Sequence, residues 1–170
     1  MPTNLEVKAK IPSIEQGIAI ANLLKLKFIE ILNQVDTYFV VPKGRLKLRE
    51  INDVDGELIY YERDEYSNHR QSKFEVYKTK DPSLLRLILE QAFGVQNIVS
   101  KKRYLYMFND TRIHFDNVSN LGSFLEFEVP MNSVIIEEPQ ATMQFLIQSF
   151  HLNETDFIKR SYLDLIQSKS

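Results

Sequence analysis

The sequence contains no cysteine, and this absence excludes several kinds of site. Without thiols, the chain can form no disulfide, no thiolate nucleophile and no cysteine-based zinc site. A metal ion would have to be held by carboxylate oxygens or by the three histidines. Oxygen ligands of this kind suit hard divalent cations.

Long apolar runs are missing as well. No stretch approaches the ~20 apolar residues that a helix needs to span a bilayer, and the first residues lack a basic segment followed by an apolar stretch. We therefore expect a cytoplasmic protein with no membrane partner. The formal net charge of −2 argues against a general affinity for nucleic acid.

The length and composition favour one globular unit. The chain has 170 residues, of which 44% are hydrophobic, which is enough to bury a sizeable core. We found no internal repeat, low-complexity tract or linker that would divide it. We expect a single domain over residues 1–170, acting as a monomer or a homodimer.

The segment from Arg112 to Val129 alternates polar and apolar residues on both sides of a turn at Gly122, which predicts a β-hairpin. One face of it would carry the polar residues Arg112, His114, Asp116, Glu126 and Glu128. Such a face can bind a divalent metal through its carboxylates and phosphate through its cations. Taken alone, the pattern favours a hairpin with one solvated face.

Similar alternation predicts further strands over Leu5–Ile11, Ile31–Val41, Arg45–Arg49, Glu57–Arg63, Gln71–Lys78 and Val99–Phe108. In the strand near residues 71–78, either Arg70 and Ser72 or Lys73 and Glu75 could occupy the charged face. Helices are predicted from Ser13, with Ile14 to Phe28 at helical spacing, over 81–94, from Glu138 to about Phe150, and from Asn153 to Ile166. The first two of these helices are expected to serve packing.

One curved antiparallel sheet, with helices over its apolar face, would gather the charged residues on its other face. That face would collect nine cations, Lys8, Lys10, Arg45, Lys47, Arg49, Arg63, Lys101, Arg103 and Arg112, and four carboxylates, Glu6, Asp116, Glu126 and Glu128. A sheet closed into a barrel with this charged lumen would attract a polyanion, and the carboxylates would hold metal ions that bridge its oxygens.

Six stretches in this order resemble the CYTH family, which is named for class IV adenylate cyclases and thiamine triphosphatases. They are Glu6–Lys10, Gln34–Phe39, Gly44–Arg49, Glu57–Arg63, Lys101–Arg103, and His114–Asp116 with Leu121–Glu128. The resemblance covers nearly the whole chain and is greatest to the bacterial branch labelled class IV adenylate cyclase-like. It implies an α+β fold: an eight-stranded antiparallel closed β-barrel, or triphosphate tunnel, with helices packed outside.

The resemblance also implies a site that binds a triphosphate with Mg²⁺ or Mn²⁺. Lys10, Arg49, Arg63, Lys101, Arg103 and Arg112 would bind phosphate. Lys8, Arg45 and Lys47 are further expected substrate-binding residues, and His114 shares the inward-facing parity. Glu6, Asp116, Glu126 and Glu128 would hold metal, and Glu6 and Lys10 are the expected catalytic residues. Lys159–Tyr162 resembles a segment that family members place near the tunnel mouth.

One residue departs from the family pattern. The family's first strand reads Glu-x-Glu-x-Lys, whereas this chain has Lys8 at the middle acidic position. A cation there removes a potential metal ligand and repels a nearby metal, so one metal site would be weakened or lost.

Three functions follow as hypotheses. The first is metal-dependent hydrolysis of a nucleoside or other organic triphosphate, such as ATP or thiamine triphosphate, or of tripolyphosphate. The second is a class IV adenylate cyclase, which converts ATP to cyclic AMP and pyrophosphate. The third, suggested by Lys8, is a triphosphate-binding module without catalysis.

Overall fold

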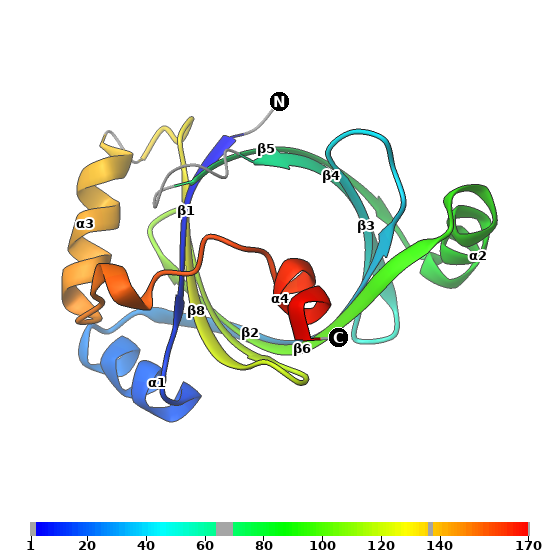
Figure 1. Cartoon of the computed structure of the whole chain (residues 1–170). Coiled ribbons are helices and arrows are strands. Elements are labelled where there is room, and N and C mark those ends of the chain that lie inside the picture. The colour runs from blue at the N-terminus through cyan, green and yellow to red at the C-terminus, as the bar shows by residue number, and fades with distance from the viewer. Residues whose placement is uncertain (1–2, 64–69, 136–137, 170) are drawn as a thin grey trace.

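The computed structural model describes residues 3–63, 70–135 and 138–169, without the side chains of residues 63 and 70–72. Its eight strands form a closed barrel in the order β1-β5-β4-β3-β2-β6-β7-β8, with all neighbours antiparallel (Figure 1). This confirms the expected fold class. The strands are Thr3–Lys10 (β1), Lys27–Phe39 (β2), Arg45–Ile51 (β3), Asp55–Arg63 (β4), Arg70–Thr79 (β5), Val95–Phe108 (β6), Thr111–Val118 (β7) and Gly122–Pro130 (β8).

In the described ranges, four α-helices lie outside the barrel: Ile14–Leu23 (α1), Pro82–Phe93 (α2), Pro139–Ser149 (α3) and Tyr162–Lys169 (α4). In Figure 1, α1 and α3 cover one side of the barrel and α2 the opposite side, while α4 lies in front of the barrel opening. Within the described residues, no helix is both long enough and apolar enough to cross a membrane.

The main core lies between β7, β8 and the two helices α1 and α3. Outward-pointing side chains such as Ile113, Phe115 and Phe127 are fully buried there, because alternation places them opposite the polar inward residues. Gly17 allows the close approach of α1, since a Cβ at that position would stand 2.6 Å from the ring of Phe115. The strands that carry charge inward are thus held from outside by apolar packing.

The first helix is shorter than the sequence pattern predicts. It ends at Leu23, and Lys25 adopts a left-handed conformation with φ of 55° that reverses the chain. Phe28, expected on this helix, instead lies in β2, with its ring 5.3 Å from that of Tyr106. The strand therefore begins four residues before the predicted Ile31.

The helix predicted over residues 153–166 is also wrong. The structure has a short 3-10 helix at Glu154–Asp156, then an extended segment, and only then α4. The extended segment runs beside β1: Phe157 pairs with Ala9, and the Ile158 amide donates to the Lys8 carbonyl at 2.8 Å. A helix would have to use those backbone groups internally.

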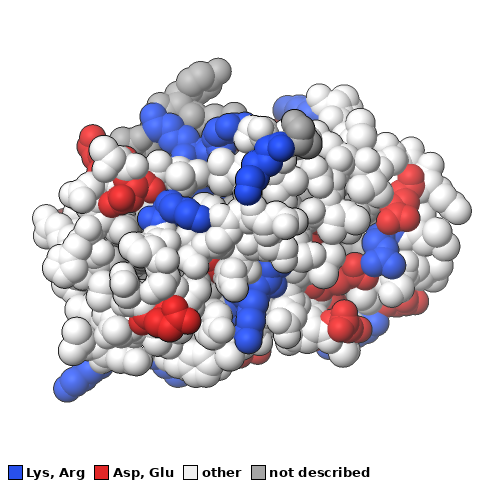
Figure 2. Space-filling model, turned by 60° about the horizontal axis from the view of Figure 1, so that its bottom comes forward, with Lys and Arg blue, Asp and Glu red and all other residues white. Residues whose placement is uncertain are grey.

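The direction of the β5 side chains, left open by the sequence, is now determined. Phe74, Val76 and Lys78 line the barrel interior, while Lys73 and Glu75 are exposed. The side chains of Arg70 and Ser72 are not among those that the structure describes. On the outer face in Figure 2, charged side chains of both signs are scattered over a mostly uncharged surface.

Candidate functional site in the barrel

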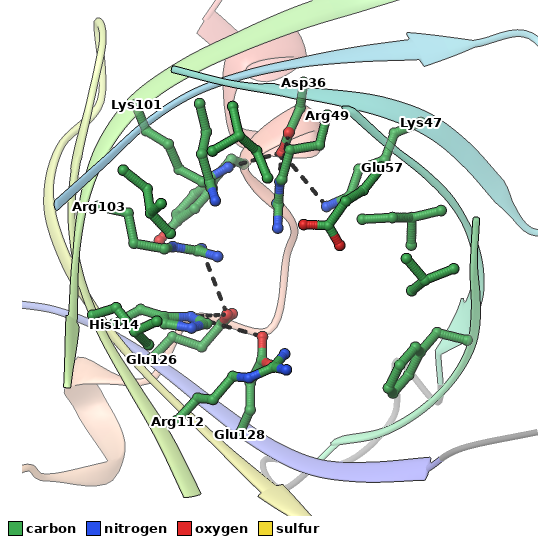
Figure 3. A pocket seen from close by; sticks show the side chains of 18 of the residues that line it. Asp36, Lys47, Arg49, Glu57, Lys101, Arg103, Arg112, His114, Glu126 and Glu128 are labelled. Carbon is green, nitrogen blue, oxygen red and sulfur yellow. Dashed lines mark hydrogen bonds and ion pairs between the residues drawn. The ribbon is translucent and has the colours of Figure 1, made fainter. Parts of the chain in front are cut away.

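A cavity of about 520 Å³ occupies the barrel, and its lining divides into three walls (Figure 3). We call them the basic wall on β3, β2 and β6, the acidic wall on β7, β8 and β1, and the apolar wall on β4 and β5. The basic wall carries Lys47, Arg49, Asp36, Lys101 and Arg103; the acidic wall carries Arg112, His114, Glu126, Glu128, Glu6 and Lys8; and the apolar wall carries Ile59, Tyr61, Phe74 and Val76.

Among the side chains that the structure describes, the cavity lining carries equal numbers of cations and anions. Its described lining has seven Lys or Arg residues, namely Lys8, Lys47, Arg49, Lys78, Lys101, Arg103 and Arg112. It also has seven Asp or Glu residues, namely Glu6, Glu30, Asp36, Asp55, Glu57, Glu126 and Glu128. The described part of the lining therefore adds carboxylates to which the sequence assigned no role, and the side chain of Arg63, one of the nine expected cations, lies outside the description.

Asp36 organises the basic wall. Its carboxylate accepts two hydrogen bonds from Arg49, through Nε and Nη2, and one from Lys101 Nζ, each at 2.8 Å. Lys47 Nζ lies 3.5 Å from the same carboxylate. Asp36 is 1% exposed, so one buried anion positions three cations that face the cavity. Part of their positive charge remains available to an anionic ligand.

Burial and the charges of neighbouring groups shift the pKa values of Asp36 and Lys101 in opposite directions. Burial favours a higher pKa for Asp36, but the charges of Arg49, Lys101 and Lys47 outweigh it and hold the pKa well below its usual range. Burial lowers the pKa of Lys101 to about 8, although the Asp36 charge acts against this shift. Lys101 therefore loses its proton closer to neutral pH than an ordinary lysine.

Arg103 is held by a second buried carboxylate. Its Nε and Nη2 donate to the two oxygens of Asp116 at 2.7 Å, and the Tyr162 hydroxyl donates to Asp116 at 2.8 Å. Although burial acts to raise it, the charge and hydrogen bonds of Arg103 lower the pKa of Asp116 to about 2. Asp116 is thus an ionised anchor for Arg103 behind the lining, rather than part of it.

The acidic wall brings three potential metal ligands together. His114, Glu126 and Glu128 each offer a ligand atom, and these atoms all lie within 4.8 Å of one another. His114 Nδ1 is 3.4 Å from Glu126 Oε1 and 3.7 Å from Glu128 Oε1. This follows from the pairing of β7 and β8, which sets His114 opposite Glu126 and Arg112 opposite Glu128.

The two glutamates differ in their electrostatic environment. Burial raises the pKa of Glu128, and the nearby charges of Glu126 and Glu6 raise it further, against the opposing effect of His114. For Glu126, burial is outweighed by the hydrogen bond with His114 and by the charges of Lys8 and Arg103, so its pKa lies well below the usual range. The acidic wall is therefore one electrostatically linked group.

Lys8 is built into this wall. Its Nζ lies 3.9 Å from Glu126 Oε2 and 4.0 Å from the centre of the Tyr162 ring, and it donates to the Arg160 carbonyl at 3.5 Å. The side chain is 3% exposed. In the barrel, β1 pairs Lys8 directly with Glu126. The amino group thus supplies positive charge beside a carboxylate of the metal-ligand group.

Several predicted residues do not reach the described lining. Lys10 is exposed at the end of β1, where its Nζ donates to the Leu121 carbonyl at 2.6 Å. Arg45 donates to Asp164 of α4 at 2.8 and 3.1 Å. Asp116 lies behind Arg103, and the side chain of Arg63 is outside the description. Glu6, Lys8, Lys47, Arg49, Lys101, Arg103, Arg112, His114, Glu126 and Glu128 do line the cavity.

Sequence reasoning missed the residue at the centre of the basic wall. Asp36 stood inside one of the family-like stretches but received no role. Its parity with Gln34 and Tyr38, which also line the cavity, is the signal that could have identified it. Glu30, Asp55, Glu57 and Lys78 were missed in the same way.

Comparison with known proteins agrees with this architecture. A protein of Methanocaldococcus jannaschii, named as a candidate adenylate cyclase, is 25% identical over 174 residues, covering 95% of this chain and 97% of its own. The PH1012 protein of Pyrococcus horikoshii is 26% identical with a TM-score of 0.81, over 95% of this chain and 98% of its own. A conserved protein of Pyrococcus furiosus is 25% identical with a TM-score of 0.84, over 95% of this chain and 99% of its own.

A family model agrees with these individual likenesses and covers almost the whole barrel. The model of the CYTH domain matches residues 2–162, which include all eight strands and the first residue of α4. The chain therefore belongs to the CYTH family.

Proposed function

We propose that the protein is a metal-dependent triphosphatase that binds its substrate between the basic and acidic walls. The observation that carries the proposal is their arrangement. His114, Glu126 and Glu128 gather on one side of the cavity, and the cations held by Asp36 stand on another (Figure 3). A triphosphate needs both a metal and cations to balance the charge on its oxygens.

The acidic wall fits a divalent cation. Its ligand atoms are close enough to share one ion, and two of the three donors are carboxylates. The imidazole of His114 favours Mn²⁺ over Mg²⁺, because Mg²⁺ takes oxygen ligands almost exclusively. When bound, the metal would supply Lewis-acid polarisation of phosphate oxygens. Lys8 beside Glu126 occupies the position of a further ligand, which supports one metal rather than two.

The side chains of this chain account for the remaining steps. Arg49, Lys101 and Arg103 bind phosphate oxygens and stabilise the charge that develops on the leaving diphosphate. Water attacks the terminal phosphorus in line, and the bond from that phosphorus to the bridging oxygen breaks. Glu6, which pairs with Glu128 and faces the cavity, is the carboxylate that we assign to accept the proton of the water.

A product assay tests the proposal. The protein is incubated with tripolyphosphate or ATP plus Mn²⁺ or Mg²⁺, and orthophosphate, pyrophosphate and cyclic AMP are resolved. We expect orthophosphate, and we expect Glu126→Gln and Glu128→Gln each to lower kcat at least 100-fold. Glu50→Gln is the matched control, because Glu50 pairs with Arg86 outside the cavity. Cyclic AMP with pyrophosphate would identify a cyclase instead, and binding without any product would identify a non-catalytic module.

A further inference from the structure

The first half of β2 has a neighbouring strand on one side only. Strand β6 pairs with the whole of β2, whereas β3 pairs with it only from Gln34 onward. At Asn33 the gap is closed by Asn52 of the β3–β4 turn, because these two residues exchange hydrogen bonds of 2.8 and 2.9 Å. Within the described ranges, no backbone hydrogen bond outside the β2–β6 ladder reaches residues 27–32. This stretch is therefore a free strand edge, with backbone groups available for pairing.

The free edge carries apolar side chains that are open to solvent. Phe28, Ile29 and Ile31 are 50%, 38% and 42% exposed. Lys27 and Glu30 on the same edge are exposed as well, and neither has an ion-pair partner among the described residues. An exposed apolar strand edge is a typical place for pairing with a strand of another chain, since main-chain hydrogen bonds then add to apolar contacts.

The sequence of this edge is complementary to itself. When two copies pair antiparallel, Lys27-Phe28-Ile29-Glu30 lies against the same four residues in the reverse order. Phe28 then stands opposite Ile29 of the second copy, and Lys27 stands opposite its Glu30. Opposite charges that face each other across an antiparallel pair stabilise it, and like charges destabilise it. A second copy of this chain therefore provides both the charges and the apolar groups that the edge requires.

An irregularity in β2 makes this charge pairing possible. Residues three apart in a regular strand point to opposite faces. Here the register with β6 shifts between Phe28 and Glu30, so that Lys27 pairs with Met107 and Glu30 pairs with Leu105. Met107 and Leu105 are two residues apart and share a face of β6. Lys27 and Glu30 therefore share a face of β2, and each can meet its opposite charge on the second copy.

We propose that the protein forms a two-fold symmetric homodimer in which residues 27–30 of the two β2 edges pair antiparallel. Glu30 is exposed and also lines the cavity, so it lies where the cavity opens. The pairing would place Lys27 of the second copy beside this opening. The inference is independent of the proposed function, because it uses no contact with phosphate or metal.

Sedimentation velocity at increasing protein concentration tests the dimer. We expect the wild type to sediment as a dimer. Glu30→Lys and Lys27→Glu should each weaken dimerisation about tenfold, because each substitution sets like charges against one another at both ends of the pair. Lys27→Glu combined with Glu30→Lys restores opposite charges, so this double variant should dimerise within about threefold of the wild type.

Glu75→Lys is the matched control, because it makes the same change of charge at an exposed position of β5, away from the β2 edge. Its dissociation constant should equal that of the wild type. Far-UV circular dichroism checks that each variant is folded, which we expect because the substituted side chains are all exposed.

Three outcomes would overturn the proposal. A wild type that stays monomeric at every concentration would show that the irregularity and the two charges protect the edge instead. A dimer that neither single charge reversal weakens, or that Glu75→Lys weakens equally, would have its interface elsewhere. Weakening in both single variants without recovery in the double variant would exclude the pairing of Lys27 with Glu30.

Discussion

Lys8 is a buried cation in the acidic wall of the cavity. It stands opposite Glu126 on the neighbouring strand, with its amino group 3.9 Å from that carboxylate and over the face of Tyr162. Repulsion between neighbouring buried carboxylates is relieved either by a cation or by a metal. Lys8 provides a positively charged side chain at this point, where a bound metal ion would otherwise be needed.

This role predicts the behaviour of Lys8→Glu. Without metal, the new carboxylate would face Glu126 in a buried position, so we expect a loss of about 3 kcal/mol in the free energy of unfolding and a fall of roughly 6–12 °C in Tm. Added Mn²⁺ should restore more of the Tm than it adds to the wild type. Lys8→Met is the control, because it removes the amine without adding a ligand. If Mn²⁺ raised the Tm of the wild type, Lys8→Glu and Lys8→Met by the same amount, this role of Lys8 would be contradicted.

Asp36 has an equally direct test. In Asp36→Asn, Arg49 and Lys101 would remain buried without their counter-charge, and we expect a loss of about 3–5 kcal/mol in urea unfolding. Glu50→Gln breaks the ion pair with Arg86, which is 39% exposed, and should cost no more than about 1 kcal/mol. Similar losses in both variants would show that Asp36 does not organise the basic wall.

At the scale of elements, α4 and the segment before it join the site to the outside of the barrel. Asp164 of α4 accepts two hydrogen bonds from Arg45 on β3, and Tyr162 at the start of α4 reaches the Asp116–Arg103 pair. The sequence placed Lys159–Tyr162 near a tunnel mouth, and Ser161 and Tyr162 do line the cavity. Helix α4 therefore fixes the position of a residue that would bind phosphate.

Removing the Tyr162 hydroxyl measures this link. Tyr162→Phe loses a hydrogen bond to the buried, ionised Asp116, and we expect a cost of about 1.5–3 kcal/mol in the free energy of unfolding. Tyr60→Phe loses a bond of the same length, 2.8 Å, to Glu62 on the outer surface, where water can replace it. That control should lose less than about 1 kcal/mol. An equal effect of both substitutions would disprove the link.

At the scale of the whole molecule, the described lining of the lumen places charges of both signs on each charged wall: Asp36 lies among the cations of the basic wall, and Lys8 and Arg112 lie among the glutamates of the acidic wall. The basic wall keeps its cations ordered by buried carboxylates, at the cost of burying Lys101 deeply enough to lower its pKa to about 8. The capacity of the lumen to bind a polyanion therefore depends on pH within an accessible range.

Binding and stability should respond to pH in opposite directions. As the pH rises from 7 to 9, Lys101 loses its charge, so the KM for a triphosphate should rise severalfold. The pKa of Lys101 is about 8 in the folded protein and about 10.4 in the unfolded chain. Between these two pH values the unfolded chain binds more protons at Lys101 than the folded protein does. The contribution of Lys101 to the free energy of unfolding therefore rises with pH in this range. Lys101→Met is the control, because any change of its KM with pH comes from titration of the substrate or of other groups. If the KM rose equally with pH in Lys101→Met and in the wild type, titration of Lys101 would not be the cause of the rise.

The residue pattern by itself predicted the strands and, except for β5, their inward and outward faces, because alternation with a period of two is written into each strand. The closed barrel was implied by the resemblance to the family. The pattern also identified most of the cations and glutamates that line the cavity. Helix ends were less predictable, since the ends of α1 and α4 depend on a left-handed residue and on pairing with β1.

Only the tertiary structure decided which charges neutralise one another. Asp116 carries the same alternation as Glu126, yet it anchors Arg103 behind the lining, and Asp36 binds cations from two other strands. Arg49 and Asp116 come from strands that are consecutive with those of their partners, whereas Lys101 reaches Asp36 from β6, a strand distant in sequence. For the same reason, the hairpin from Arg112 to Val129 shows its carboxylates in the sequence, while the cation beside Glu126 is supplied by Lys8 at the other end of the chain.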